Sequence, residues 1–261
     1  MQAYNNIDQR IHQLSQTLAK FGRSFADHKT DDSHTNLYFD LVGKTIWGRW
    51  AILNNTAYIL GLDLEAQEFK ILNKNQESIN HFEISGKTQA SVEQEIATFL
   101  KENLKADKDD FLKPLHFEIP AYSFLDKTVL PFEEDALSNW MKYRQVANDV
   151  CQLITSHLNV ETETRIWPHH FDTGVYFETT PKLAIGFGWA MADSMVPDPY
   201  FYFSAYGLNG HQVDYKTTTP LTVGKWMITE HWKGGVLPMQ EASFENCQTF
   251  IKETAAWAVK K

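Results

Sequence analysis

Histidines and carboxylates suited to chemistry are concentrated between residues 165 and 202. The first cluster, residues 167–172, reads Trp-Pro-His-His-Phe-Asp. On an extended chain His170 and Asp172 point to the same side, because side chains alternate along a strand. An imidazole and a carboxylate at this spacing can share a metal ion, or the carboxylate can orient the imidazole as a base. We therefore predict His170 and Asp172 as catalytic residues and as ligands of a divalent metal ion.

The second cluster, residues 193–202, combines acids, prolines and tyrosines. Pro197 and Pro199 bracket Asp198, and this stiffening lowers the entropic cost of holding a carboxylate in position. We predict Asp193 and Asp198 as further catalytic acids. Six residues are predicted to contact a ligand, because rings and one more acid would surround these groups in an aromatic cleft: Trp167, Glu178, Trp189, Tyr200, Tyr202 and Trp232.

The same residues also have structural interpretations. His170 can satisfy a backbone carbonyl, and Asp172 can be a turn residue before Thr173 and Gly174. The stretch from His231 to Gly235 favours a glycine-rich turn with an exposed histidine over a turn that brings a histidine and a cation to a cleft. No established metal spacing, nucleophile elbow or phosphate-binding loop is present in the sequence. The clusters therefore indicate a place to look for function, and the nature of the reaction stays open.

Alternating helix and strand patterns indicate how these residues are positioned. Apolar residues at spacings of three and four predict helices over residues 7–25, 92–100, 137–158 and 244–257. Asn5 or Asn6, Ser91, and Asp135 or Ser138 are the predicted caps or starts of the first three. Strand formers punctuated by turns predict meanders over 37–72 and 165–229.

These patterns predict an α+β fold with antiparallel meanders flanked by helices. We expect one globular unit, 1–261, built from two similar helix–meander–helix halves, 1–110 and 132–261. A connector that contains Pro114, Pro120 and Pro131 joins the halves. The halves share no clear residue-level similarity, so their likeness is one of architecture.

Composition excludes several classes of partner. The net charge of −9 repels phosphate backbones, so we expect no nucleic acid, and a small molecule is the favoured partner. Cys151 and Cys247 form no disulfide framework. No secretory signal and no long apolar run is visible, which predicts a cytoplasmic protein without a membrane span. The oligomeric state stays open.

The two clusters together resemble a bacterial protein family of unknown function. Its members share a Trp-Pro-x-His-Phe-Asp stretch, matched by residues 167–172, and an Asp ahead of Pro-acid-Pro-Tyr-x-Tyr, matched by Asp193 and residues 197–202. Residues 232–237 are similar to a late tryptophan–glycine segment of the family. Many relatives carry Glu where His169 stands, and Asp193 lies one residue further from its Pro than in the family. The resemblance implies no activity.

Two hypotheses from different classes follow. In the first, the chain is an enzyme in which His170 acts as base or ligand, Asp172 orients it, and Asp193 and Asp198 supply charge for hydrolysis or another acid–base step. In the second, it is a non-catalytic binding protein with an aromatic cleft, which Phe171 also lines. A third interpretation is that the polar groups only satisfy one another.

Overall fold

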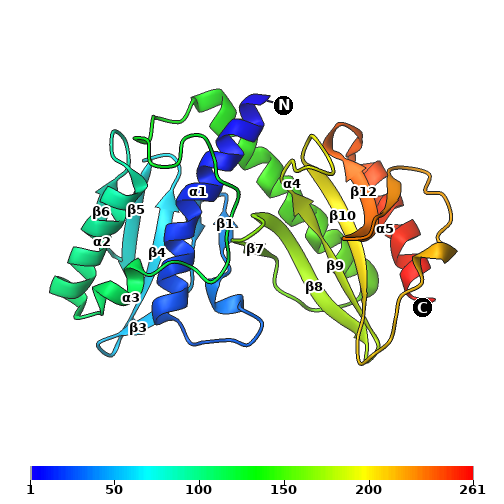
Figure 1. Cartoon of the computed structure of the whole chain (residues 1–261), viewed down its shortest axis with the longest axis horizontal. Helices are drawn as coiled ribbons and strands as arrows, with labels where there is room; N and C mark the ends of the chain where they lie inside the picture. Colours follow the sequence, from blue (N-terminus) through cyan, green and yellow to red (C-terminus); the bar gives the residue numbers. More distant parts are fainter. Residues whose placement is uncertain (1, 261) are drawn as a thin grey trace. The chain divides into compact units, whose positions relative to one another are not determined.

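The structure is a computed structural model that describes residues 2–260 and confirms the α+β fold class (Figure 1). The described residues form five α-helices and twelve strands in two antiparallel sheets. Backbone contacts divide them into two compact units. The N-terminal unit holds residues 2–142 and 166–171, and the C-terminal unit holds residues 143–165 and 172–260. The expectation of a single globular unit stays a prediction.

The N-terminal unit packs helices against an antiparallel sheet of order β1-β2-β4-β5-β6, in which β3 pairs with β4. Asn54 and Asn55 both have positive φ, which fits a tight two-residue turn between β3 and β4. The elements are α1 (Gln2–Phe25), β1 (Tyr38–Asp40), β2 (Thr45–Trp47), β3 (Ala51–Leu53), β4 (Thr56–Asp63), β5 (Glu68–Asn73), β6 (Ser78–Glu83), α2 (Gln89–Leu104) and α3 (Lys108–Leu112).

The predicted helix caps are wrong in this unit, although the helices themselves are present. Helix α1 already includes Gln2, so Asn5 and Asn6 lie inside it, and the Asn6 side chain accepts a hydrogen bond from Gln2 instead. Helix α2 is capped by Thr88, whose hydroxyl accepts from the Ser91 backbone N–H at 3.2 Å. Ser91 is therefore the residue that the cap satisfies.

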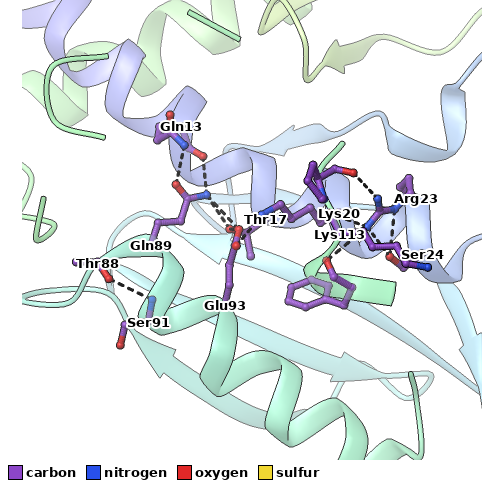
Figure 2. A network of polar contacts seen from close by, with 12 residues as sticks. Gln13, Thr17, Lys20, Arg23, Ser24, Thr88, Gln89, Ser91, Glu93 and Lys113 are labelled. Atoms are coloured by element: carbon purple, nitrogen blue, oxygen red, sulfur yellow. Dashed lines mark hydrogen bonds and ion pairs between the residues drawn. The ribbon is translucent and has the colours of Figure 1, made fainter. Parts of the chain in front are cut away.

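A buried polar network joins α1 to α2 (Figure 2). The Glu93 carboxylate on α2 accepts from the Thr17 hydroxyl at 2.9 Å and from the Lys20 ammonium at 2.7 Å. The Gln89 amide donates to Thr17 at 3.1 Å, and it exchanges hydrogen bonds with Gln13. Because Glu93 is buried, each of its hydrogen bonds offsets a desolvation cost, and the network fixes α2 against α1.

Side chains of α1 also hold the connector, which is irregular apart from α3. The Arg23 guanidinium donates to the carbonyls of Asp110 and Pro114, both at 2.7 Å, near the end of α3. Further along, His12 donates from Nε2 to the Pro168 carbonyl, so its Nδ1 accepts from the Tyr122 hydroxyl at 2.7 Å. Arg10 donates to the Leu130 carbonyl. The connector is thus tied to one helix at three points along its length.

The C-terminal unit has a sheet of order β11-β12-β10-β9-β8. Helix α4 begins at Glu134, ahead of the predicted Asp135 or Ser138, and its residues from Tyr143 onward belong to this unit. Two acids in the first turn favour this start, since they face the positive end of the helix dipole. The remaining elements along the chain are α4 (Glu134–Leu158), β7 (Arg165–Trp167), of which only Arg165 belongs to this unit, β8 (Asp172–Thr180), β9 (Leu183–Ala190), β10 (Tyr200–Gly207), β11 (Lys225–Ile228), β12 (Lys233–Pro238) and α5 (Phe244–Ala258).

The glycine-rich turn predicted at residues 231–235 is wrong in its glycines, because Gly234 and Gly235 lie inside β12, whereas the exposed His231 does lie in the turn before that strand. Gly235 pairs with Phe203 of β10 and with Trp226 of β11. A Cβ atom at Gly235 would lie 3.1 Å from the Phe250 ring of α5. The glycine therefore provides space for a helix to pack on the strand, where the sequence alone favoured a turn.

Helices α4 and α5 pack on one face of this sheet. Trp189 stacks on Tyr143 of α4, and Phe187 contacts Phe250 of α5. Both cysteines are buried on these helices, and burial raises the pKa of the Cys247 thiol to about 11 and that of Cys151 still further. Among the described helices, none is long and apolar enough to cross a membrane.

The polar network gives a test of how α1 and α2 are held together. Glu93→Gln places an amide N–H₂ or an uncharged oxygen against Lys20, so we expect the free energy of unfolding to fall by about 1–3 kcal/mol. Glu95→Gln on the same helix is the matched control. It removes only the exposed ion pair with Lys87, which is worth at most about 1 kcal/mol. Urea unfolding followed by circular dichroism measures both, and equal losses would contradict the assignment.

Candidate functional site

The Trp167–Asp172 stretch is not extended. The alternation of side chains along a strand, from which His170 and Asp172 were predicted to point to the same side, therefore does not apply to them. Residues 168–171 form a turn in which the Phe171 N–H donates to the Trp167 carbonyl at 2.6 Å. Phe171 has a φ of 54°, in the left-handed region. Its ring is fully buried in the N-terminal unit, stacked on His12 at 5.0 Å, so Phe171 is a core residue. Burial of this ring holds the turn in place.

The two histidines of the turn differ in exposure. His169 is half-buried beside Phe117, whereas His170 is exposed, and their ring centroids lie 4.3 Å apart. Burial, and then the neighbouring His170, lower the pKa of His169 to about 4. His169 is therefore neutral near pH 7. Trp167, also half-buried, and both histidines belong to the N-terminal unit, whereas the other predicted site residues belong to the C-terminal unit.

The ligand set does not fit a metal centre. Within residues 2–260, no group of three or more His, Cys, Asp or Glu side chains is placed to hold an ion. A structural or catalytic zinc site needs at least three such ligands at close range. His170 and Asp172 therefore have no third such ligand beside them among residues 2–260, and the metal ion predicted there stays a prediction.

In the C-terminal unit, two predicted tyrosines each donate to a predicted aspartate. The Tyr202 hydroxyl donates to Asp172 Oδ2 at 2.5 Å, and the Tyr200 hydroxyl donates to Asp193 Oδ2 at 2.7 Å. Burial, with these carboxylates, raises the pKa of both phenols. The tyrosines therefore stay protonated and act as hydrogen-bond donors, and the carboxylates act as acceptors.

Asp193 and Asp198 organise the loop before β10. Asp193 Oδ1 accepts from the backbone N–H groups of Met195 and Val196, at 2.7 and 2.8 Å, as an aspartate in a tight turn does. Asp198 Oδ2 accepts from the Gln240 amide at 2.5 Å. Both residues thus have structural partners, and these hydrogen bonds hold the loop that precedes Tyr200.

Three of the predicted ring residues pack together in the C-terminal unit, whereas Trp189 lies apart from them. Tyr200, Tyr202 and Trp232 pack together around Val196. Trp189 is buried on the opposite face of the sheet, under α4, because it alternates with Gly188, which pairs with Tyr202. Trp189 therefore belongs to the helix-covered core and does not lie beside the two tyrosines.

Three glycines allow tyrosine rings to lie flat against the sheet. A Cβ atom at Gly174 or Gly188 would lie 2.9 or 3.0 Å from the Tyr202 hydroxyl, and one at Gly186 would lie 3.0 Å from the Tyr206 ring. At Gly188 the added atom would also meet the Thr173 carbonyl oxygen at 2.5 Å. Strands β8 and β9 therefore approach each other closely where they support these rings.

We define the tyrosine face as the sheet face that carries Asp172, Tyr176, Glu178, Tyr202 and Tyr206. Tyr176 and Tyr206 are 45% and 43% exposed, with ring centroids 6.0 Å apart and planes inclined at 48°. Glu178 is exposed on the same strand as Tyr176, and after burial its charge is the second cause that raises the pKa of that phenol.

Tyr176 and Tyr206 were missed in the sequence, although a signal was present. Tyr206 continues the every-second-residue pattern of Tyr200 and Tyr202, and Tyr176 lies two residues before Glu178. That alternation places all five on one side of their strands once the register is known. Glu178 lies on β8, and its predicted role in binding a ligand stays a prediction.

Comparison with known proteins adds no relative, since the chain matches no protein-family model, no curated protein and no solved structure. The resemblance to a bacterial family of unknown function therefore stays a prediction.

The glycine support of the rings can be tested by adding one carbon atom. Gly188→Ala forces a Cβ atom against the Thr173 carbonyl, and we expect it to lower the free energy of unfolding by about 1–3 kcal/mol. Gly186→Ala meets only the half-exposed Tyr206 ring, which can rotate away, so its loss should be below about 1 kcal/mol. Thermal unfolding of the pair measures the difference. The reverse order would contradict the proposed close approach.

The low pKa of His169 gives a pH-dependent prediction. The unfolded chain takes up a proton at its ordinary pKa of 6.5, whereas the folded chain does so only near 4. The unfolded state therefore binds more protons between these values, so this group's stabilisation is present above pH 6.5 and is lost as pH falls to 4. His169→Gln should reduce the fall in urea midpoint between about pH 7 and about pH 4.5. An unchanged pH profile would contradict the prediction, and His157→Gln, on exposed helix surface, is the control.

Proposed function

We propose that the chain is a binding protein whose C-terminal unit holds a small organic cation on the tyrosine face. The observation that carries this proposal is the pair of half-exposed phenol rings, Tyr176 and Tyr206, beside the exposed carboxylate of Glu178. An aromatic ring attracts a cation through the negative charge density of its face. A carboxylate at the edge adds a charge of the sign that a cation needs.

The charge of the surrounding strands supports a cation over an anion. Strands β8, β9 and β10 carry Asp172 and Glu178 but no Lys, Arg or His side chain. The raised pKa values of Tyr176 and Tyr206 keep both phenols neutral, so their rings keep their hydroxyl donors. The net charge of −9 raises the local concentration of cations around the whole protein.

The hydrogen bonds of the carboxylates favour binding over catalysis. Asp172 and Asp193 accept from tyrosine hydroxyls, and Asp198 accepts from Gln240. A general base needs to reach a substrate proton, whereas these oxygens already serve as acceptors within the protein. The catalytic hypothesis for His170, Asp172, Asp193 and Asp198 stays a prediction, and the non-catalytic alternative is the one that the geometry of these contacts supports.

Comparing choline with its uncharged carbon isostere separates the contribution of the positive charge to binding from that of the molecule's shape. We expect choline to shift the ring proton signals of Tyr176 and Tyr206 in a saturable manner, and the isostere to bind more weakly. Tyr206→Leu and Glu178→Gln should each weaken choline binding by about two- to five-fold, the effect of about 0.5–1 kcal/mol for one exposed cation–π contact or one surface charge.

Controls distinguish a specific site from general acidity. Glu83→Gln removes an exposed carboxylate from β6 in the other sheet and should leave choline binding unchanged. The effect of Glu178→Gln should shrink at high salt, because exposed charges are screened. Equal binding of choline and its isostere, or equal binding by the Tyr206→Leu variant, would overturn the proposal.

A further inference from the structure

A cavity of about 200 Å³ lies in the N-terminal unit between α1 and the connector. Arg10, Gln13 and Leu14 of α1 line one side, Gln89 at the start of α2 lines another, and connector residues 124–130 line the rest. It lies in a different unit from the tyrosine face, so it is independent of the function proposed there.

Backbone hydrogen bonds fix the connector wall of this cavity. The Val129 N–H donates to the Lys87 carbonyl at 2.8 Å, and the Val129 carbonyl accepts from the Gly86 N–H at 2.9 Å. Residues 122–127 are held by turn hydrogen bonds, from Leu125 to Tyr122 and from Lys127 to Phe124. The wall is therefore tied to the loop before α2, and the cavity does not depend on side chains alone for its shape.

Gln13 and Gln89 form a polar part of the lining, and hydrogen bonds between these two residues fix their side chains. The Gln13 amide donates to the Gln89 side-chain oxygen at 2.8 Å, and the Gln89 amide donates back to the Gln13 backbone carbonyl at 2.9 Å (Figure 2). These bonds orient both amides without a ligand. A site whose groups are already oriented loses less entropy when a ligand enters.

The cavity combines apolar walls with one partly buried cation. Leu14 is buried, Phe124 and Val129 are half-buried, and Leu125 and Leu130 are 43% and 67% exposed, so apolar surface surrounds the opening. Large exposed aliphatic side chains at one opening are typical of a binding site for an apolar group.

Arg10 supplies the charge. Its guanidinium lies 4.7 Å from the centre of the Phe132 ring and donates through Nη2 to the Leu130 carbonyl. The fork of an arginine has five N–H donors, so one hydrogen bond leaves others able to face the cavity. Two other charged residues of the lining, Asp126 and Lys127, are exposed and of opposite sign. Of the three charged residues of the lining, Arg10 is the partly buried one, and its positive charge favours an anion.

We propose that this cavity binds a small aliphatic carboxylate, with its carboxylate on Arg10 and its chain between Leu14 and connector residues 124–130. Carboxylates match the planar arginine fork, and the apolar walls match a short hydrocarbon chain. The volume has room for about seven groups of the size of a water molecule, which corresponds to an acid such as hexanoate.

Hexanoate and hexanol test the charge and the chain separately in the full-length protein. Saturable shifts of the Leu14 and Val129 methyl signals are expected with hexanoate, and binding of hexanol at least about ten-fold weaker. Arg10→Gln should weaken hexanoate binding by about ten-fold. Arg23→Gln is the matched control, because Arg23 also ties the connector to α1 but does not line the cavity, so hexanoate binding should be unchanged.

A second variant covers the case in which Arg10→Gln disturbs the connector. Leu130→Glu changes an exposed side chain and leaves its backbone carbonyl in place, so folding is preserved while a negative charge is placed at the opening. It should weaken hexanoate binding several-fold and leave hexanol binding nearly unchanged. Equal affinities for hexanoate and hexanol, full affinity in both variants, or no saturable shift up to about 10 mM would each overturn the proposal.

Discussion

The close approach of β8 and β9 at Gly174 and Gly188 is the constraint on which the C-terminal unit depends. A side chain at either position would meet a carbonyl oxygen of the neighbouring strand. Because neither glycine has one, Tyr202 lies across both strands and its hydroxyl reaches Asp172. The bulky residues of β9 are then restricted to the other face, where Phe187 and Trp189 provide the core under the helices. One pair of glycines therefore determines which face is buried and which carries phenols.

In the N-terminal unit the main constraint is the irregular connector, whose backbone carbonyls need hydrogen-bond donors. A buried or half-buried carbonyl needs a donor, and a segment outside helices and sheets cannot supply one by itself. Arg23 and Arg10 of α1 supply donors at its two ends, and His12 contacts Tyr122 between them. The same helix thus buries its apolar face in the core and uses its polar face to order more than twenty residues of connector.

Strand patterns were readable from the sequence where composition and environment agree. Strands β9 and β10 are rich in aromatic residues, and both lie within the meander predicted over residues 165–229. β12 was missed because Gly234 and Gly235 have the composition of a turn, and only the packing of α5 explains glycines in a strand. Local composition cannot report a neighbour that is distant in the sequence.

The candidate site was predictable in its residues more than in its geometry. Asp172, Glu178, Tyr200 and Tyr202 were identified by type and spacing, whereas the partner of each aspartate depends on register. Asp172 and Tyr202 are thirty residues apart and meet only through the pairing of β8, β9 and β10. The extended chain assumed at residues 168–171 failed because burial of the Phe171 ring holds that residue in the left-handed region.

The buried thiols of Cys151 on α4 and Cys247 on α5 can report when these helices separate from the sheet of the C-terminal unit. The Cys151 Sγ lies 3.8 Å from the Thr173 carbonyl oxygen, between α4 and the sheet, and its burial raises its pKa. Alkylating reagents react with exposed thiolates, so modification of this sulfur has to wait until helix and sheet separate. The rate of alkylation of Cys151 therefore measures how often α4 leaves β8, in the native chain and without any engineered label.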